Sequence, residues 1–220
     1  MIHVDTVDVW GFDHAIRGMR NPLNSWDRSD SYEQGADVLD NCSNCCIGEF
    51  VVGEDDLKLM QQLCNAGTEH RKFMRQIFVS MDIVAPLYWW KEFDTYKIGT
   101  VSNSCSTMHT LHKRDLTVDD FSFEDLGDIQ HELLEDLIEE INVLRRAYVD
   151  TGDKRYWRMM IQMLPESYNQ RRTITMNYEN VLSMIRQRQN HRLSEWREFC
   201  HIISGFPYVK DLIETAHSKR

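Results

Sequence analysis

Residues 164–197 read LPESYNQRRTITMNYENVLSMIRQRQNHRLSEWR, and this stretch decides the fold. Within it, Arg171–Asn177 is rich in β-branched residues and predicts a strand. Asn180–Gln187 carries apolar residues at helical spacing and predicts a helix. A polar break at Gln189–His191 then precedes a last helix, which Ser194 is suited to cap. A strand followed by two helices indicates an α+β fold with more helix than strand.

Upstream segments carry further signals. Glu54–Cys64 begins with three acidic residues, which the N-terminus of a helix favours, and is predicted to be helical. Phe73–Ile83 is rich in β-branched and aromatic residues and predicts a strand. Pro86–Phe93 predicts a short helix whose two tryptophans, Trp89 and Trp90, are expected in the core rather than against a cofactor.

A helical hairpin is predicted over residues 123–164. Phe123–Tyr148 and Lys154–Leu164 both have helical periodicity, and Thr151–Asp153 breaks the chain between them. The apolar face expected for the first helix comprises Leu126, Ile129, Leu133, Leu137, Ile141 and Leu144. We interpret its acidic opposite face as solvated and not as a metal site.

Length and composition predict a single domain over residues 1–220. Hydrophobic residues make up 42% and charged residues 27% of the chain, as in ordinary globular proteins. The first fifty residues are polar and rich in turn-forming residues. We therefore expect residues 1–50 to form an irregular N-terminal extension that packs on the rest through Trp10, Phe12 and Trp26.

Charge and hydropathy exclude several classes of protein. The chain has no apolar run near the roughly 20 residues that span a bilayer, and its N-terminus lacks the features of a secretory signal. The expectation is a cytoplasmic protein with no membrane partner. The net charge of −10 repels nucleic-acid backbones, so no nucleic-acid partner is expected either.

The six cysteines predict no metal site. Cys42, Cys45 and Cys46 contain one C-x-x-C, but no second pair follows at the spacing of a zinc site. Reduced cysteines in a cytosolic protein are the expected state.

Arginines are concentrated in the C-terminal part of an otherwise acidic chain. Residues 171–192 contain five arginines and one acid, whereas residues 115–140 contain eleven acids. Arg171, Arg188, Arg192 and Arg197 come from consecutive elements and are expected to converge on a compact anion, which guanidinium groups bind bidentately. Backbone N–H groups near Ser194 would add donors. The alternative is that these arginines pair with the acidic hairpin.

The same stretch resembles the C-terminal half of flavin-dependent thymidylate synthases. The resemblance rests on Leu164–Arg171, Thr175–Asn177, Leu182–Arg188 and Arg192–Trp196. The corresponding family features are a Leu-Pro, a Thr-Arg that opens a strand, a Thr-x-Asn, a helix ending in Leu-Arg, and an Ala-Gln-Trp-Glu-Ile-Arg helix. The family implies a central, mostly antiparallel sheet with a long helical hairpin and flanking helices, assembled as a homotetramer that binds FAD and dUMP.

Two upstream segments extend this resemblance, which covers about residues 67–200. Glu69-His70 resembles the Glu-His of the family, whose histidine contacts the flavin. Glu92–Met108 corresponds to the signature Gln-x-x-Arg-His-Arg-x-x-Ser-x-Asn-Glu-x-Ser-x-Arg, with one extra residue that brings Asn103 and Ser106 onto the family's Asn and Ser.

The signature also departs from the family pattern. Arg-His-Arg is replaced by Thr95-Tyr96-Lys97, the final Arg by Met108, and the Gln by Glu92. These changes are compatible with a divergent flavin enzyme, with a changed pyrimidine substrate, or with reduced catalysis. Arg17 and Arg20 are candidates to replace the lost charge.

The resemblance implies a role for each matched residue. The substrate-binding residues would be Glu92, Ser104, Cys105, Ser106 and Arg171. The flavin-binding residues would be His70, Lys72, Thr95, Tyr96, Lys97, Ile98, Arg188 and His191. The catalytic residue would be Arg192 or Arg197, facing the pyrimidine carbonyls and stabilising negative charge. A one-residue slip leaves the choice between these two open.

The implied reaction is reductive methylation of dUMP to dTMP. Methylenetetrahydrofolate would supply the carbon, reduced FAD the hydride, and NADPH the electrons for the flavin. Two alternatives remain: flavin- and folate-dependent hydroxymethylation or methylation of another pyrimidine nucleotide, and a non-catalytic helical interaction protein.

Overall fold

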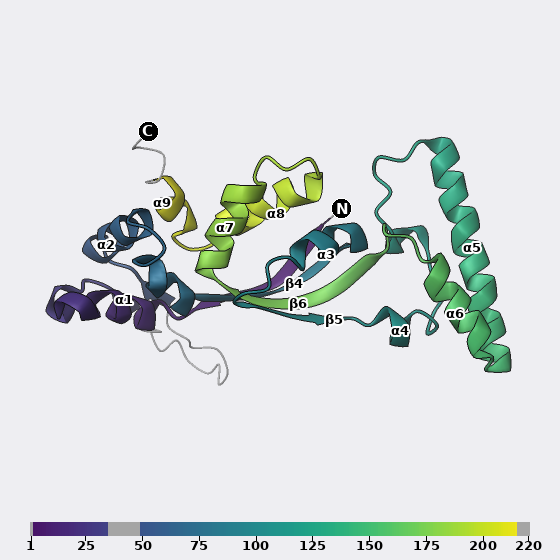
Figure 1. The fold of residues 1–220 in the computed structure, drawn as a ribbon, viewed down its shortest axis with the longest axis horizontal. Helices are drawn as coiled ribbons and strands as arrows, with labels where there is room; N and C mark the ends of the chain where they lie inside the picture. The colour runs from purple at the N-terminus through teal and green to yellow at the C-terminus, as the bar shows by residue number, and fades with distance from the viewer. Residues whose placement is uncertain (1, 35–48, 215–220) are drawn as a thin grey trace, which may run out of the picture. The chain divides into compact units, whose positions relative to one another are not determined.

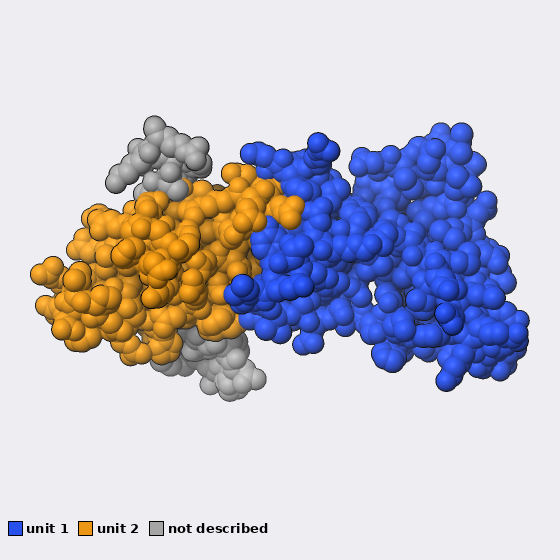
Figure 2. Space-filling view, viewed as in Figure 1, with its two compact units in different colours: residues 1–7, 80–175, 190–199 blue, residues 8–79, 176–189, 200–220 orange. Residues whose placement is uncertain are grey.

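The computed structural model describes residues 2–34 and 49–214 and combines helices with β-sheet (Figure 1). The described residues form two compact units, coloured separately in Figure 2. Unit 1 contains residues 2–7, 80–175 and 190–199, and unit 2 contains residues 8–34, 49–79, 176–189 and 200–214. Cys42, Cys45 and Cys46 lie outside the described residues.

The central sheet is antiparallel and has the strand order β1-β4-β6-β5. The strands are β1 (His3–Trp10), β4 (Phe78–Pro86), β6 (Asn169–Asn177) and β5 (Thr100–Ser104). The predicted strand Arg171–Asn177 is confirmed within β6. Ile174 and Met176 are buried there, whereas Arg171 and Thr173 point to the exposed face, as the two-residue period of a strand requires.

The predicted strand Phe73–Ile83 is wrong in its first half. Residues Arg71–Gln76 form a 3₁₀ helix, and β4 begins only at Phe78. Phe73 and Met74 are buried as consecutive residues, which a strand with one buried face does not allow. Alternation of buried and open positions begins at Val79.

The expectation of irregular backbone in residues 1–50 is also wrong where the structure describes them. Besides β1, residues Phe12–Arg20 form α1. Gly11, with φ of 95°, connects the two, and a Cβ at this position would lie 2.2 Å from the carbonyl oxygen of Gln76. The apolar residues of β1 are Val4, Val7, Val9 and Trp10, which do not follow one regular two-residue alternation along the strand, and α1 is short.

Short elements follow α1. They are the 3₁₀ helices Asn21–Leu23 and Trp26–Arg28, and a two-stranded antiparallel sheet of β2 (Tyr32–Gln34) and β3 (Glu49–Val51).

The remaining helices include most of those predicted. In chain order they are α2 (Glu54–Asn65), α3 (Leu87–Phe93), α4 (Thr107–Thr110), the 3₁₀ helix Val118–Asp120, α7 (Tyr178–Arg188), α8 (Ser194–Ser204) and α9 (Val209–Glu214). Ser194 is the first residue of α8 rather than the residue before it. No helix among the described residues has the length and apolar character needed to cross a membrane.

The hairpin in unit 1 consists of α5 (Asp128–Thr151) and α6 (Lys154–Met163) (Figure 1). Gly152 ends α5 in the left-handed conformation, and the Asp153 side chain accepts a hydrogen bond from the Arg155 N–H to cap α6. The apolar core of the hairpin is formed by Leu111, Leu116, Phe121, Leu134, Ile138, Ile141, Leu144 and Met160.

The buried face of α5 differs from the predicted one over its first half. Ile129 and Leu133 are 69% and 62% exposed, and Leu134 and Ile138 are buried instead. The helix begins five residues later than expected, at Asp128, so Leu126 precedes it. From Ile141 onward the predicted and observed faces coincide.

Candidate functional site

Arg171 lies on the exposed face of the sheet in unit 1, between carboxylates from two other strands. Its Nη2 is 2.7 Å from Asp82 Oδ2 on β4 and 3.2 Å from Asp5 Oδ1 on β1. The other oxygen of Asp82 accepts a hydrogen bond of 2.5 Å from the Thr173 hydroxyl. These bonds, from Thr173 first and from Arg171 second, lower the pKa of Asp82, so its carboxylate remains charged at neutral pH.

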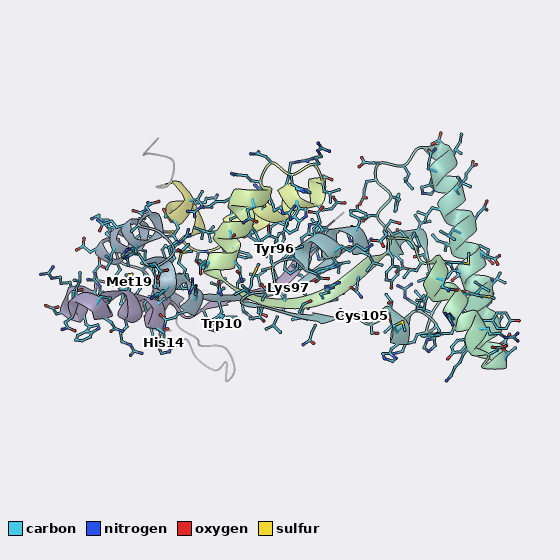
Figure 3. All side chains as sticks on the ribbon, in the orientation of Figure 1. Trp10, His14, Met19, Tyr96, Lys97 and Cys105 are labelled. Carbon is cyan, nitrogen blue, oxygen red and sulfur yellow. The ribbon has the colours of Figure 1, made fainter. Side chains whose placement is uncertain are left out.

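The segment Ser104–Ser106 runs beside Arg171. The Cys105 N–H donates to the Arg171 carbonyl at 2.9 Å, and the Gln170 side chain donates to the Cys105 carbonyl at 2.9 Å. Cys105 is an exposed free thiol at the end of β5 (Figure 3). Four of the five residues expected to bind substrate are therefore contributed by the adjacent strands β5 and β6 and by the residues that directly follow β5.

The fifth, Glu92, is paired with a residue expected to bind flavin. His191 Nε2 is 3.3 Å from Glu92 Oε2, and His191 Nδ1 accepts the Leu193 N–H at 3.2 Å. A ring nitrogen that accepts a backbone N–H carries no proton, so this arrangement places the proton of neutral His191 on Nε2. The pair links α3 to the loop before α8.

Arg197 and Arg192 have different surroundings. Arg197 Nη1 donates to the carbonyls of His191 at 2.7 Å and of Arg192 at 2.9 Å, so its guanidinium holds the loop that joins α7 to α8. The Arg192 side chain is exposed. None of Arg171, Arg192 and Arg197 forms an ion pair with the acidic hairpin among the interactions found in the described residues.

The residues Thr95–Ile98 follow α3 directly. The Thr95 hydroxyl donates to the Glu92 carbonyl at 2.7 Å, and the Tyr96 ring packs 5.9 Å from Trp196. Lys97 and Ile98 are exposed, Ile98 to 90%. Lys97 is the one cation of the altered Arg-His-Arg motif.

An aromatic cluster supports these elements. It consists of Trp89, Trp90, Phe93, Trp196 and Phe199, all almost completely buried, which confirms the expected core position of both α3 tryptophans. The Arg172 guanidinium lies 4.2 Å from the centroid of the Trp90 ring and 2.7 Å from Asp94. Arg172 therefore faces the core side of β6, opposite Arg171.

Unit 2 contains the other three residues expected to bind flavin. His70 is exposed at the start of the 3₁₀ helix, Lys72 is 3.9 Å from Glu69, and Arg188 ends α7.

Two further cations, Arg71 and Arg75, were missed. Arg71 lies just before the predicted strand Phe73–Ile83 and Arg75 lies within it, whereas both belong to the 3₁₀ helix Arg71–Gln76 in the structure. Both face Glu179 of α7: Arg75 forms a hydrogen-bonded ion pair with it, and Arg71 Nε is 4.0 Å away. Arg71 Nε is shielded from solvent and has no hydrogen-bond partner among the residues that the structure describes. Such an atom is costly to bury unless a ligand or water satisfies it, so this cluster is suited to an anion.

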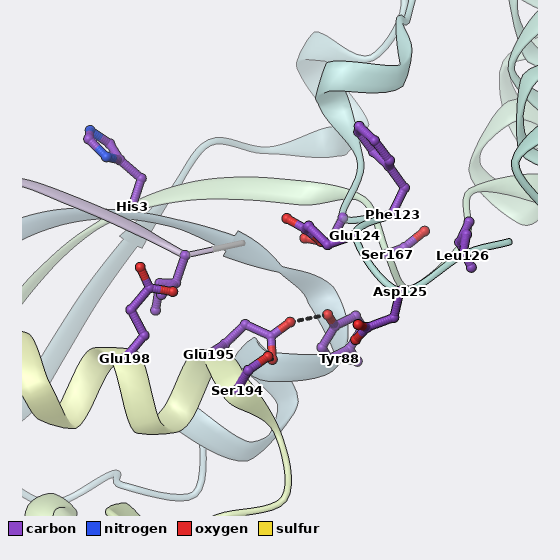
Figure 4. A pocket seen from close by; sticks show the side chains of 12 residues that line it. His3, Tyr88, Phe123, Glu124, Asp125, Leu126, Ser167, Ser194, Glu195 and Glu198 are labelled. Carbon is purple, nitrogen blue, oxygen red and sulfur yellow. Dashed lines mark hydrogen bonds between the residues drawn. The ribbon is translucent and has the colours of Figure 1, made fainter.

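A separate cavity of about 650 Å³ lies in unit 1 (Figure 4). Its lining includes Glu124, Asp125, Glu195 and Glu198, and Glu195 accepts a hydrogen bond from the Tyr88 hydroxyl. Burial and the neighbouring carboxylate raise the pKa of Tyr88. None of the residues proposed from the resemblance lines this cavity. Among the described residues there is no cluster of His, Cys, Asp and Glu able to hold a metal ion.

Comparison with known proteins supports the fold. No protein-family model and no curated sequence matches the chain. Two crystal structures of thymidylate synthase X from Helicobacter pylori, both with FAD and dUMP, match with TM-scores of 0.68 at 14% sequence identity. The matches cover 99% and 97% of this chain, and 100% and 99% of theirs. The chain therefore has the fold of the flavin-dependent thymidylate synthases over nearly its whole length.

Proposed function

We propose that this protein is a FAD-dependent enzyme that adds a one-carbon group to C5 of a pyrimidine, with reductive methylation of dUMP to dTMP as the reference reaction. The observation that carries the proposal is the full-length match to enzymes solved with FAD and dUMP. A shared fold does not fix a reaction, so the proposal also rests on the residues that follow.

The FAD phosphates are assigned to the cationic cluster of unit 2. Arg71 and Arg75 face Glu179 from the 3₁₀ helix, and Arg71 Nε makes no hydrogen bond within the described part of the chain, which suits a phosphate oxygen. His70 and Lys72 belong to the same short segment, and Arg188 ends the helix that carries Glu179. Bound FAD would supply the hydride that the reaction requires.

In unit 1, the chain's own residues would orient the pyrimidine. Exposed Arg192 is the better candidate to face the pyrimidine carbonyls, because Arg197 is engaged with the loop carbonyls. Thr95, Tyr96, Lys97, Ile98 and His191 remain proposed flavin contacts. Methylenetetrahydrofolate as carbon donor, NADPH as reductant, a homotetramer and a cytoplasmic location complete the proposal, and these rest on the family resemblance.

FAD binding tests the proposal directly. The purified protein should take up FAD, become yellow and gain thermal stability that rises with the logarithm of the free FAD concentration above its Kd. Replacing Arg71 with Gln should raise the Kd for FAD about tenfold, the loss of roughly one charge-assisted hydrogen bond. Arg155→Gln is the matched control, because Arg155 pairs with Asp153 at the surface of the hairpin. Protein that takes up no FAD on reconstitution would overturn the proposal.

A product assay distinguishes the reaction. FAD-loaded protein, methylenetetrahydrofolate and a pyrimidine are incubated with and without NADPH, and the product is identified by mass spectrometry. A methylated pyrimidine formed only with NADPH supports the reference reaction. A hydroxymethylated product formed in both cases would replace it with the alternative that the altered Arg-His-Arg motif leaves open.

A further inference from the structure

We infer that the pyrimidine ligand of this site is uncharged at the end that meets Arg171: a nucleoside, not a nucleoside monophosphate. This inference rests on the proposed function and concerns the substrate class of that same site. The observation that carries it is the charge balance around Arg171, the single cation among the residues expected to bind substrate.

Arg171 is already neutralised by the chain itself. One nitrogen of its guanidinium contacts carboxylates on two different strands, at 2.7 Å for Asp82 and 3.2 Å for Asp5. Two carboxylates therefore face one guanidinium, and a further titratable group, His3, has its Nε2 3.4 Å from Asp5 Oδ2. A phosphate monoester carries close to two further negative charges at neutral pH and is bound where cations exceed anions.

The two carboxylates are not flexible counter-ions that a phosphate would displace. Both belong to strands of the sheet, and Asp82 is additionally held by the Thr173 hydroxyl at 2.5 Å. A phosphate bound to the remaining N–H groups of the same guanidinium would lie close to these carboxylates, and like charges at short range repel even in partly screened solvent. The arrangement thus opposes a phosphate at this position.

The other residues expected to bind substrate add no positive charge. Ser104, Cys105 and Ser106 are uncharged, and Glu92 contributes a carboxylate that is paired with His191. A 5′-hydroxyl suits these surroundings better than a phosphate, because it donates one hydrogen bond to a carboxylate and accepts another from a guanidinium or a serine. A nucleoside satisfies both requirements without an excess charge.

Binding of 2′-deoxyuridine and of dUMP to the FAD-loaded protein tests the inference, with isothermal titration as the measurement. We expect deoxyuridine to bind at least about tenfold more tightly than dUMP. Asp82→Asn should then tighten dUMP binding about tenfold and change deoxyuridine binding little, since it removes one like charge near the phosphate. Asp5→Asn should have a smaller effect in the same direction.

Asp94→Asn is the matched control. Asp94 pairs with Arg172 at 2.7 Å, the same separation as in the pair of Asp82 with Arg171, but Arg172 faces the core side of β6. This variant should leave the ratio of the two affinities unchanged. An equal gain in dUMP affinity from Asp94→Asn would show a general effect of net charge and would contradict the inference.

Three outcomes separate failure of the inference from failure of the proposed function. If dUMP binds about tenfold more tightly than deoxyuridine and Arg171→Gln abolishes that preference, the inference is overturned and the proposed function stands. If FAD binds but neither pyrimidine does, the inference is likewise overturned. If FAD itself does not bind, the proposed function fails.

Discussion

Arg20 Nε donates a hydrogen bond of 2.6 Å to Asp56 Oδ1, and both side chains are buried, at 5% and 0% exposure. Arg20 ends α1, whereas Asp56 lies in the first turn of α2. Asp56 Oδ2 also accepts hydrogen bonds from the hydroxyls of Ser29 and Ser31 and from the backbone N–H groups of Asp30 and Ser31. One carboxylate thus ties two helices and the segment between them, and Arg20 is not available to replace a lost cation elsewhere.

Replacing Asp56 with Ala should destabilise unit 2 strongly. The substitution leaves the Arg20 charge buried without its partner and frees several donors, which together cost about 3–5 kcal/mol. Urea denaturation measures the change. Asp55→Ala is the control, because Asp55 is exposed and forms only a weak pair with Lys58, and it should cost less than about 1 kcal/mol. A similar loss in both variants would contradict the role of Asp56.

The same carboxylate should make stability fall in acid. Burial by itself raises the pKa of Asp56, but hydrogen bonds from Ser29, Ser31 and Arg20 outweigh burial and lower the pKa below its model-compound value of 3.8. A lowered folded-state pKa stabilises the protein above the unfolded-state value, and this stabilisation is lost as the pH falls through the folded-state pKa. The urea concentration at the denaturation midpoint should therefore decrease as the pH is lowered below about 4. Asp56→Asn should flatten the dependence of the midpoint on pH in this range.

Substitution of Arg197 should affect thermal stability, whereas substitution of Arg192 should affect pyrimidine binding. Arg197→Gln removes two hydrogen bonds to the carbonyls of the loop before α8 and should lower the Tm by several degrees. Arg192→Gln should leave the Tm unchanged and weaken pyrimidine binding to the FAD-loaded protein about tenfold or more. Thermal melts and ligand titrations on both variants measure the two effects. The reverse pattern would assign the ligand to Arg197.

Two substitutions in α5 test which face of this helix is buried in the hairpin. Ile141→Ala creates a cavity in the hairpin core and should cost about 2–5 kcal/mol. Leu133→Ala changes a residue of the same helix that is 62% exposed and should cost less than about 1 kcal/mol. Chemical denaturation of both variants distinguishes them. Equal losses would mean that α5 buries the face that the sequence periodicity predicts.

The C-terminal elements were predictable because each carries a strong local signal. β6 alternates around Ile174 and Met176, and α7 repeats apolar residues at helical spacing. β1 was missed because its apolar residues do not alternate regularly, and its position depends on pairing with β4. The register of α5 was misjudged because apolar residues occur on two overlapping stripes, and only packing against α6 selects the one with Leu134 and Ile138.

The sequence identified Arg171 of the candidate site, but it did not predict the charged residues that surround Arg171. Arg171 was identified from the sequence, whereas its partners Asp5 and Asp82 lie far away in the chain. Their approach is fixed by the order of the strands, which no local pattern contains. The loop role of Arg197 depends likewise on where the chain turns after α7. The contribution of Arg71 depends on Glu179 of α7, which is distant in the chain and which no local pattern places beside it.

Arg171 and Arg172 are neighbours in sequence but lie on opposite faces of β6. Arg172 stacks on Trp90 and maintains the core, whereas Arg171 meets solvent and the proposed ligand. Mutation can therefore alter the solvent face without weakening the aromatic packing behind it. A few substitutions on the solvent-exposed face of such a strand can change which ligand it binds. Natural selection for folding acts on the other face. This independence gives a physical route by which an ancestral scaffold acquires new specificity.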